Sequence, residues 1–509
     1  MTSTVTSTDP VRPPVGPLLF GFPRGAWLII AVEFMERFSF YGMLAILALF
    51  LTAPPTKGGF GWSDGEALGL LGLYSGLMYA LPALGGYLAD RFWGGRKAVR
   101  NGASLMVLGH FLMAAPAFFP WLLTQLSGVP VAEHLATLGV SLGRFGVGPR
   151  LAQALAGLPP ATAAQVGLGY RLVTASFFLA LTCLVVGNAL MKSTLAVLVG
   201  DLFDPEDGRK DGAYAYYYLG IALGAMLSGV IIGSVAETFG WHYGFTVAGF
   251  GMAGALGLYV GLGPRFLGQV GIKPKAPERL VGSRVLTPAE RADTWRRVTI
   301  LGVLGTVLFV FSTGWFQIVG TWTLFIERSV DRTIGGFSVP TPWFVSFNSL
   351  LVIVATPFVA RWLIRMEAAR RRIDIVSKYV AALLLAAAAN AALAMAAGGG
   401  GPGAMVGAGW PVIGISILSF GELLAWPSTY GMVYRLAPLG MASAAMGVWY
   451  LMTLGAGGYA AGEVGQLIER VGPATLFWGL AIGLAGVALV TLLIGPWLRR
   501  QAARAGSWL

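Results

Sequence analysis

Residues 25–51 read "GAWLIIAVEFMERFSFYGMLAILALFL", an apolar run that nevertheless contains Glu33, Glu36 and Arg37. An α-helix needs roughly 20 residues to cross the hydrocarbon core of a membrane, so this run is long enough to span one. A charged side chain near the centre of such a helix costs about 2.5–3.5 kcal/mol on translocon scales. We therefore predict that these three side chains pair with one another or meet water inside the protein.

The rest of the chain has the same apolar character. Of its 509 residues, 56% are hydrophobic and 11% are charged, and its mean hydropathy is +0.71. The polar surface of a soluble protein of this size is missing, and the strict alternation of membrane β-barrels is absent. The composition thus indicates an all-α integral membrane protein. We predict twelve membrane-spanning helices, at about 25–51, 66–89, 98–119, 170–200, 213–235, 243–263, 297–325, 341–363, 377–397, 411–435, 441–464 and 473–497.

The distribution of basic residues predicts the orientation of the chain. The net charge is +12, which on its own would be compatible with nucleic-acid binding. However, most Lys and Arg residues lie in the tails and in alternate loops, such as 91–100, 265–297 and 361–378. This asymmetry follows the positive-inside rule. It predicts that both termini are cytoplasmic and that nucleic acid is not a partner; the cytoplasmic (inner) membrane of a bacterium is the location that the leading hypothesis below assigns.

Polar stretches divide the chain into segments. The N-terminal residues lack the basic region and cleavage site of a signal peptide. A long Pro-rich, basic connection separates six predicted helices from the next six, and an insertion with the apolar spacing of one or two amphipathic surface helices follows the third. We predict a cytoplasmic tail at 1–24, an N-terminal six-helix bundle at 25–263 with an extracytoplasmic insertion at 120–169, a cytoplasmic linker at 264–296, a C-terminal six-helix bundle at 297–497 and a cytoplasmic tail at 498–509.

The sequence lacks the motifs of soluble enzymes. HExxH and GxSxG are absent, and His110, His134 and His242 have no ligand-like spacing. Cys183 is the only cysteine, which excludes an intrachain disulfide and a cysteine-based metal cluster. We expect no enzymatic activity, no metal and no organic cofactor.

Helical geometry places the three charges of the first span on one face. At 100° per residue, Arg37 is displaced by about 40° from Glu33, and Glu36 by about 60° in the other direction. Lys192, in the predicted helix 170–200, lies at the depth of Glu33, about 8–9 residues from the inner surface. Two interpretations remain open: a static salt-bridge cluster that joins the two helices, or a set of ion pairs that exchange as a proton binds, as in a coupled transporter.

Glu422 is the other buried acidic residue of interest. It lies in "SFGELLAWPSTYG", near the middle of the predicted helix 411–435, and no Lys or Arg of the C-terminal half shares its depth. A carboxylate without a basic partner is expected to face a ligand and to attract an amine.

Two motifs resemble those of known transporters. "GGYLADRFWGGRKAVR" at 85–100 resembles the cytoplasmic loop motif of the major facilitator superfamily, which implies a gating role for Asp90, Arg91, Arg96 and Lys97. The Glu33-x-x-Glu36-Arg37 pattern, followed by Tyr41 and a glycine, resembles the ExxER signature of the proton-coupled oligopeptide transporters.

The likeness continues through nearly all predicted helices. It implies the major facilitator superfamily fold, with twelve transmembrane helices in two six-helix bundles. The matching segments are "LVVGNALMKSTLAVLVGDLF" with Lys192, "YYYLGIALGA", "GWHYGF", Gln317, "SVPTPWFVSFNSLL" with Asn348, "GELLAWPSTYGMVYRLAP" with Glu422, and "MGVWYLMTLGAGGYAAG" with Trp449.

The resemblance implies roles for individual residues. In this family the ExxER carboxylates exchange partners with a helix 4 lysine as a proton moves, which implies proton coupling by Glu33, Glu36, Arg37 and Lys192. The helix 10 glutamate, here Glu422, binds the amino terminus of a peptide. The implied substrate site consists of Tyr41, Tyr79, Lys192, Gln317, Asn348, Glu422, Trp426 and Trp449.

Several positions depart from the family pattern. Leu44 replaces an arginine that helps to hold the peptide carboxylate, and by helical angle it lies about 20° from Glu33, facing the expected cavity. Phe316 replaces a helix 7 carboxylate, Ala222 replaces a helix 5 asparagine, and Trp426 replaces a small residue. The expected pocket is therefore less polar, and Lys192 is its only basic group for a substrate carboxylate.

The leading hypothesis is a proton-coupled symporter that takes up di- and tripeptides or peptide-like molecules by alternating access, as a monomer surrounded by membrane lipid. Leu44 and Trp426 support a first alternative, a carrier of amine- or drug-like substrates on the same scaffold. Phe316 supports a second, a membrane receptor that binds its ligand without transporting it.

Overall fold

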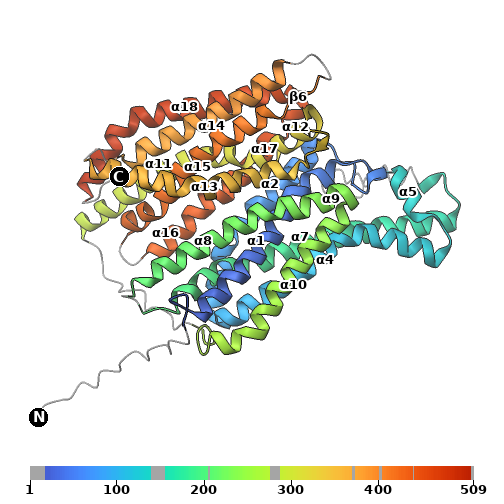
Figure 1. The fold of residues 1–509 in the computed structure, drawn as a ribbon, viewed down its shortest axis with the longest axis horizontal. Helices are drawn as coiled ribbons and strands as arrows, with labels where there is room; N and C mark the ends of the chain where they lie inside the picture. The colour runs from blue at the N-terminus through green and yellow to red at the C-terminus, as the bar shows by residue number, and fades with distance from the viewer. Residues whose placement is uncertain are drawn as a thin grey trace, which may run out of the picture.

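The computed structural model describes most of the chain, and nearly all of it is helical (Figure 1). The described residues are 18–138, 155–204, 207–274, 287–369, 373–399, 404–438 and 441–505. Parts of both predicted tails, of the 120–169 insertion and of the 264–296 linker lie outside these ranges.

The N-terminal half forms the bundle that is coloured blue to green in Figure 1. A short antiparallel hairpin precedes it, with Leu18 opposite Pro23. Its elements are β1 (Leu18–Leu19), β2 (Phe22–Pro23), α1 (Arg24–Thr52), η1 (Pro55–Lys57), α2 (Asp64–Ala80), α3 (Pro82–Leu88), η2 (Ala89–Trp93), α4 (Gly95–Ser127), α5 (Val131–Leu138), α7 (Pro160–Gly200), α8 (Arg209–Ser228), η3 (Gly229–Gly233), α9 (Ser234–Phe239) and α10 (Trp241–Phe266).

The C-terminal half forms the bundle that is coloured yellow to red (Figure 1). Its two-residue strands pair at the loops: β3 with β6 in parallel, and β4 with β5 antiparallel. Its elements are α11 (Pro288–Trp315), η4 (Phe316–Val319), α12 (Thr321–Ser329), β3 (Val330–Asp331), β4 (Thr333–Ile334), β5 (Phe337–Ser338), α13 (Pro342–Ala368), α14 (Ile375–Gly399), β6 (Val406–Gly407), α15 (Gly409–Leu436), α16 (Ala442–Tyr450), η5 (Leu451–Gly455), α17 (Ala456–Gly465) and α18 (Ile468–Arg504).

The predicted membrane fold is confirmed. Within the described residues, 11 helical segments are long and apolar enough to span a membrane. The remaining predicted span, 441–464, is present as α16, the π-helical turn η5 and α17, which follow one another without a break from Ala442 to Gly465. The chain is thus a multi-pass membrane protein of two helical bundles.

Several helices extend beyond the predicted spans. α4 continues to Ser127 and α7 already begins at Pro160, so the helices themselves occupy both ends of the expected 120–169 insertion. α11 begins at Pro288 rather than at 297, because a capping box fixes its first turn. There Thr287 Oγ1 accepts from Glu290 N at 3.3 Å, and Glu290 Oε2 accepts from Thr287 N at 2.9 Å. The linker between the bundles is correspondingly shorter than predicted.

Helix α1 lies at the centre of the N-terminal bundle. In the apolar 18-residue stretch of α1, 78% of the residues are buried inside the protein, against 28% in the corresponding stretches of α4 and α18. The latter two therefore present most of their side chains to the surroundings, whereas α1 is enclosed by other helices. Charged residues on α1 consequently face protein rather than lipid.

The packing between the bundles begins at Gly65, on the face opposite to the one where α1 begins and α18 ends, and continues inward as far as Ala83 beside Gly447. We call these two faces the opposite face and the terminal face. α2 packs against α17 with Gly72 on Gly462, so closely that a Cβ at Gly72 would lie 2.6 Å from the Gly462 Cα. Gly229 and Gly233 likewise admit Pro342 at the start of α13. The absence of side chains at these glycines lets the backbones approach.

Candidate functional site

The three charged residues of α1 form one buried cluster. Glu33, Glu36 and Arg37 are 0%, 2% and 3% exposed. Arg37 Nε donates to Glu33 Oε1 at 2.7 Å and lies 2.9 Å from Glu36 Oε2. The second contact has the distance of an ion pair but not the direction of a hydrogen bond, and neither Glu36 oxygen accepts one from the described residues. Arg37 thus forms a hydrogen-bonded ion pair with Glu33 and an ion pair without a hydrogen bond with Glu36.

Lys192 of α7 approaches this cluster without forming an ion pair. Its Nζ lies 3.7 Å from the centre of the Tyr79 ring, a cation–π contact. Among the residues that the structure describes, no carboxylate oxygen lies within 4.0 Å of Nζ. The lysine nevertheless interacts electrostatically with Arg37, Glu36 and Glu33. The first interpretation above, a static salt-bridge cluster that includes Lys192, therefore does not describe this structure.

Three tyrosines extend from the α1 cluster toward the C-terminal bundle. Tyr41 and Tyr79 interact through their hydroxyl groups. Tyr41 is in electrostatic reach of both Arg37 and Glu422, and Tyr218 of α8 is in reach of Glu422 and Tyr41. Tyr218 is still 48% exposed. Tyr218 is therefore only partly covered by its neighbours in the structure.

Glu422 of α15 is held by neutral donors. Its Oε2 accepts from Trp315 Nε1 at 2.9 Å and from Asn348 Nδ2 at 3.1 Å. The Asn348 amide also donates to Ser419 Oγ at 2.9 Å. Among the described residues, no Lys or Arg forms an ion pair with this carboxylate. The structure thus brings the predicted Asn348 and Glu422 together without a cation.

Aromatic rings line the neighbourhood of Glu422. The rings of Trp315 and Trp426 meet edge to face with centroids 6.4 Å apart, and the ring of Phe311 also meets that of Trp426 edge to face at 6.2 Å. Trp449, predicted as a further substrate contact, packs beside Gly305 of α11; it is 3% exposed, and its indole Nε1 has no hydrogen-bond partner in the described part of the chain. A buried indole N–H without an acceptor is a donor that remains available to a ligand.

The side-chain amide of Gln317, predicted as a substrate contact, is hydrogen-bonded within the C-terminal bundle. Its Nε2 donates to Thr313 O at 3.2 Å and to Ala461 O at 3.1 Å, and its Oε1 accepts from Thr321 Oγ1 at 2.8 Å. The break between α11 and α12 leaves backbone carbonyls without helical partners, and this amide binds one of them. Gln317 makes no hydrogen bond to Glu422 or to the α1 cluster in the structure.

The positions that depart from the family pattern are apolar contacts. Phe316 packs edge to face on Tyr79 at 5.8 Å and on Trp315 at 5.0 Å. It therefore bridges the tyrosine under Lys192 and the indole that binds Glu422. Leu44, which the helical angle directs toward the expected cavity, is buried in the hydrophobic core.

The motif predicted to act as a gate lies on the terminal face. Asp90 and Arg91 belong to the π-helical turn η2, and Arg96 and Lys97 begin α4. Arg96 Nη1 donates to Gly268 O at 2.7 Å, and Arg96 N donates to Gly271 O at 2.8 Å. These contacts of Arg96 stay within the N-terminal bundle, since Gly268 and Gly271 follow α10.

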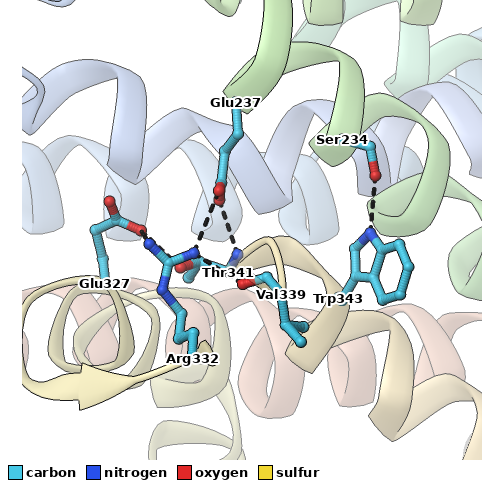
Figure 2. Close-up of polar contacts among 7 residues, drawn as sticks. All are labelled: Ser234, Glu237, Glu327, Arg332, Val339, Thr341 and Trp343. Atoms are coloured by element: carbon cyan, nitrogen blue, oxygen red, sulfur yellow. Dashed lines mark hydrogen bonds and ion pairs between the residues drawn. The ribbon is translucent and has the colours of Figure 1, made fainter. Parts of the chain in front are cut away.

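A polar cluster that the sequence did not reveal joins the bundles at the opposite face. Figure 2 shows Arg332 between Glu327 of its own bundle, at 3.0 Å, and Glu237 of α9, at 3.2 Å. Thr341 N donates to Glu237 Oε1 at 2.7 Å, and Thr341 Oγ1 donates to Glu327 Oε2 at 2.6 Å. We call Glu237, Glu327, Arg332 and Thr341 the opposite-face cluster.

Three further contacts close the same face. Trp343 Nε1 donates to Ser234 Oγ at 2.8 Å, as drawn in Figure 2. Asp64 of α2 pairs with Arg328 of α12, and Gly65 N donates to Glu469 Oε1 at 2.6 Å. Each contact joins one bundle to the other, so the opposite face is closed in this structure.

Comparison with known proteins agrees with this architecture. The POT family matches residues 96–287 and 277–478 of the chain. The peptide transporter YePEPT of Yersinia enterocolitica is 28% identical over 96% of this chain and 96% of the relative, and the uncharacterized transporter YclF of Bacillus subtilis is 26% identical over 94% and 95%. The crystal structure of a peptide transporter POT in complex with sulfate superposes with a TM-score of 0.77 at 22% identity, covering 95% of this chain and 97% of the other, which is a likeness of fold. Because the family match spans more than half of the sequence, the chain belongs to the POT family, as its motifs predicted.

Proposed function

We propose that the protein is a proton-coupled symporter that takes up di- and tripeptides or peptide-like molecules by alternating access. It would act as a monomer in the bacterial inner membrane, with both termini in the cytoplasm. The observation that carries the proposal is the division of charge within the site. Two acids and two bases lie together around α1, whereas Glu422 has only neutral partners.

Glu36 is the proton carrier in this proposal. Arg37 is hydrogen-bonded to Glu33, and Glu36 accepts no hydrogen bond from the described residues. Its ion pair with Arg37 lacks the direction of a hydrogen bond, and we therefore assign the transported proton to Glu36. Protonation of Glu36 would leave Glu33 as the only charged partner of Arg37. It would also remove one of the two carboxylate charges that attract Lys192, which could then bind a substrate carboxylate.

Glu422 would bind the other end of the substrate. The amino group of a peptide supplies the cation that the carboxylate lacks, and charge-assisted hydrogen bonds of this kind are about twice as strong as neutral ones. Tyr41 is in electrostatic reach of Arg37 and of Glu422, so the two charged ends border one region.

The opposite-face cluster supports alternating access. In this proposal, the contacts that join the bundles at the opposite face belong to a conformation whose substrate path opens toward the terminal face. In the proposed orientation that face is cytoplasmic. Transport then requires that the contacts of Glu237 with Arg332 and Thr341 break when the bundles rock apart.

Reconstituted vesicles test the proposal. We expect an inward proton gradient to drive accumulation of a dipeptide by the wild type, and we expect Glu36→Gln to lower this accumulation by at least about tenfold, within the range of typical coupling energies. Exchange of dipeptide at equal pH should persist in Glu36→Gln, because it needs no net proton movement. Glu463→Gln, an exposed acid on α17, serves as the matched control. Binding of peptide without any accumulation by the wild type would contradict the symporter and favour a receptor.

The aromatic rings near Glu422 favour a second candidate function. Glu422 has no cationic partner among the described residues, its carboxylate accepts from Trp315, and Trp426 packs on that indole. This arrangement also suits a hydrophobic amine. A thermal-shift panel separates the two. Stabilisation by di- and tripeptides but not by free amines supports the peptide symporter, and the reverse pattern supports an amine carrier.

A further inference from the structure

A cavity of about 320 Å³ lies on the terminal face, away from the proposed substrate site. Arg96, Lys97 and Arg100 of α4 form its basic side, and Tyr259 with Val260 of α10 and Ile272 form the other. None of the described residues that line it is acidic. We call it the basic cavity.

Arg96 is fixed in place at the edge of the basic cavity. Two backbone carbonyls hold the residue, Gly268 O through Nη1 at 2.7 Å and Gly271 O through the main-chain N–H at 2.8 Å. Its Nη2 lies along the last turn of α10, 3.7 Å from where a Cβ at Gly263 would be. The guanidinium has five N–H donors, and the recorded hydrogen bond uses one of them. A preorganised arginine of this kind is well suited to a phosphate.

The hydroxyl of Tyr259 points to a missing partner. Tyr259 is 4% exposed and lines the basic cavity, yet its hydroxyl has no hydrogen-bond partner among the described residues. The charge of Arg96 acts on this hydroxyl. Because a buried hydroxyl normally finds a partner, an acceptor in the cavity would satisfy it.

The start of α4 has the wrong charge for a helix N-terminus. Its cap residue Gly94 offers no side-chain acceptor, and its first turn contains no acid. Arg96, Lys97 and Arg100 lie instead within the first turns, where the helix dipole already carries partial positive charge. An anion in the basic cavity would offset the repulsion between this dipole and the three basic side chains.

We propose that the basic cavity binds the phosphate headgroup of an anionic membrane lipid. The phosphate accepts hydrogen bonds from Arg96 and Tyr259 and attracts Lys97 and Arg100. The lipid tails lie against Val260 and Ile272, which are exposed beside the cavity. A membrane lipid rather than a soluble phosphate is favoured because the cavity joins this apolar surface at the end of a membrane span, where basic pockets between helices meet headgroups.

Binding to the purified full-length protein tests the inference. Detergent-solubilised protein is titrated with short-chain phosphatidylglycerol, with phosphatidylcholine of the same chain length, and with inorganic phosphate, and retained lipid is counted by native mass spectrometry. We expect phosphatidylglycerol to bind in preference to the other two. Arg100→Gln should weaken this binding about fivefold, as expected for one interfacial basic residue. Tyr259→Phe, which removes only the hydroxyl, should weaken it by a similar factor of about five.

Arg365→Gln is the matched control, since Arg365 is an exposed arginine at the end of α13 outside the basic cavity. Equal losses in Arg365→Gln and Arg100→Gln would mean that only the overall charge matters and would overturn the proposal. Equal binding of inorganic phosphate would show a soluble-phosphate site instead of a lipid site. Neither readout involves transport, so failure of the lipid site and failure of the proposed symport are distinguishable.

Discussion

The two bundles bury charge in opposite ways. Around α1, Glu33 and Glu36 share Arg37, and Lys192 lies nearby over the ring of Tyr79. In the C-terminal bundle, Glu422 is bound by an indole and an amide and has no cation among its recorded partners. The first site is balanced in formal charge before any ligand arrives, and the second is not.

This difference separates two tasks that a coupled transporter must perform. A balanced cluster can take or lose a proton and redistribute its own ion pairs, because removing one partner changes the protonation equilibrium of the others. An unbalanced carboxylate is completed only by a cation from outside. We therefore expect substitutions at Glu422 to act on ligand affinity, and substitutions around α1 to act on coupling.

The largest effect on affinity should come from Glu422→Gln. The amide keeps the shape of the side chain but not its charge, so the charge-assisted bond to a substrate amine is lost, and dipeptide affinity should fall about 10- to 100-fold. A competition binding assay measures this. An N-acetylated dipeptide, which has no amine to lose, should bind wild type and variant alike. If its affinity falls by the same factor, Glu422 does not recognise the amine.

The opposite-face cluster should control how the two bundles communicate. Glu237→Gln weakens the contacts that cross between bundles, whereas Glu327→Gln weakens only contacts inside the C-terminal bundle. Because charged hydrogen bonds contribute about 1.5–3 kcal/mol, Glu237→Gln should raise the population with an open opposite face about tenfold or more.

Spin-label distances can measure that population. Labels at Lys57→Cys and Thr333→Cys, in a Cys183→Ser background, report the separation of the bundles across this face, since both positions are exposed there. Glu327→Gln is the matched control and should leave the distribution close to that of the wild type. Identical distributions in Glu237→Gln and the wild type would rule out a holding role for the cluster.

A smaller effect is expected from the ring under Lys192. The cation–π contact contributes about 0.5–2 kcal/mol, so Tyr79→Leu should lower gradient-driven uptake several-fold and shift its pH profile. Tyr79→Phe keeps the ring and should keep the pH profile. If Tyr79→Leu and Tyr79→Phe gave the same pH profile of uptake, the cation–π contact would have no effect on the role of Lys192 in coupling.

The smallest effect should come from an ion pair at the terminal face, outside the membrane. Arg499 Nε donates to Asp374 Oδ2 at 2.6 Å. Partial burial raises the pKa of Asp374, but its hydrogen bonds from Arg499 and Ser377 outweigh this and hold the pKa below its usual 3.8. A carboxyl whose pKa is lower in the folded than in the unfolded protein stabilises the fold at any pH above its unfolded-state pKa. This contribution is lost as the pH falls through the folded-state pKa.

Asp374→Asn should therefore lower the free energy of unfolding by less than about 1 kcal/mol at neutral pH, the usual range for exposed pairs. Thermal denaturation measured at pH 7 and below pH 4 should show the difference between variant and wild type shrinking in acid. A difference that grows in acid would reverse the assigned sign.

The sequence predicted the elements of the site better than their contacts. Helical periodicity was sufficient to put Glu33, Glu36 and Arg37 on one face, since that depends only on residue spacing. The contact of Lys192 with Tyr79 rather than with a carboxylate depends on how α7 and α2 rotate against α1, which spacing does not determine. Trp315 was missed as a partner of Glu422, although an aromatic donor two residues before Gln317 was the available signal.

The opposite-face cluster was missed for a different reason. Glu237 and Arg332 lie far apart in the sequence, in loops and helix ends that carry no periodic pattern. Gln317 illustrates the reverse error, because its likeness to a family residue gave no sign that the break before α12 would engage its amide. The partners of charged and amide residues at helix breaks therefore cannot be predicted from sequence periodicity, whereas the membrane spans could be.

The contact of Gly72 with Gly462 has a mechanical consequence. No side chain of either glycine stands between the two backbones at this point, so their separation breaks only van der Waals contacts. On either side of it, Tyr459 and Gln466 pack against Gly76 and Gly69 of α2. The ion pairs of Glu237 and Asp64 at the opposite face are bonds that must break for the bundles to part there. Once these ion pairs break, we expect the bundles to separate at the opposite face in a single cooperative step.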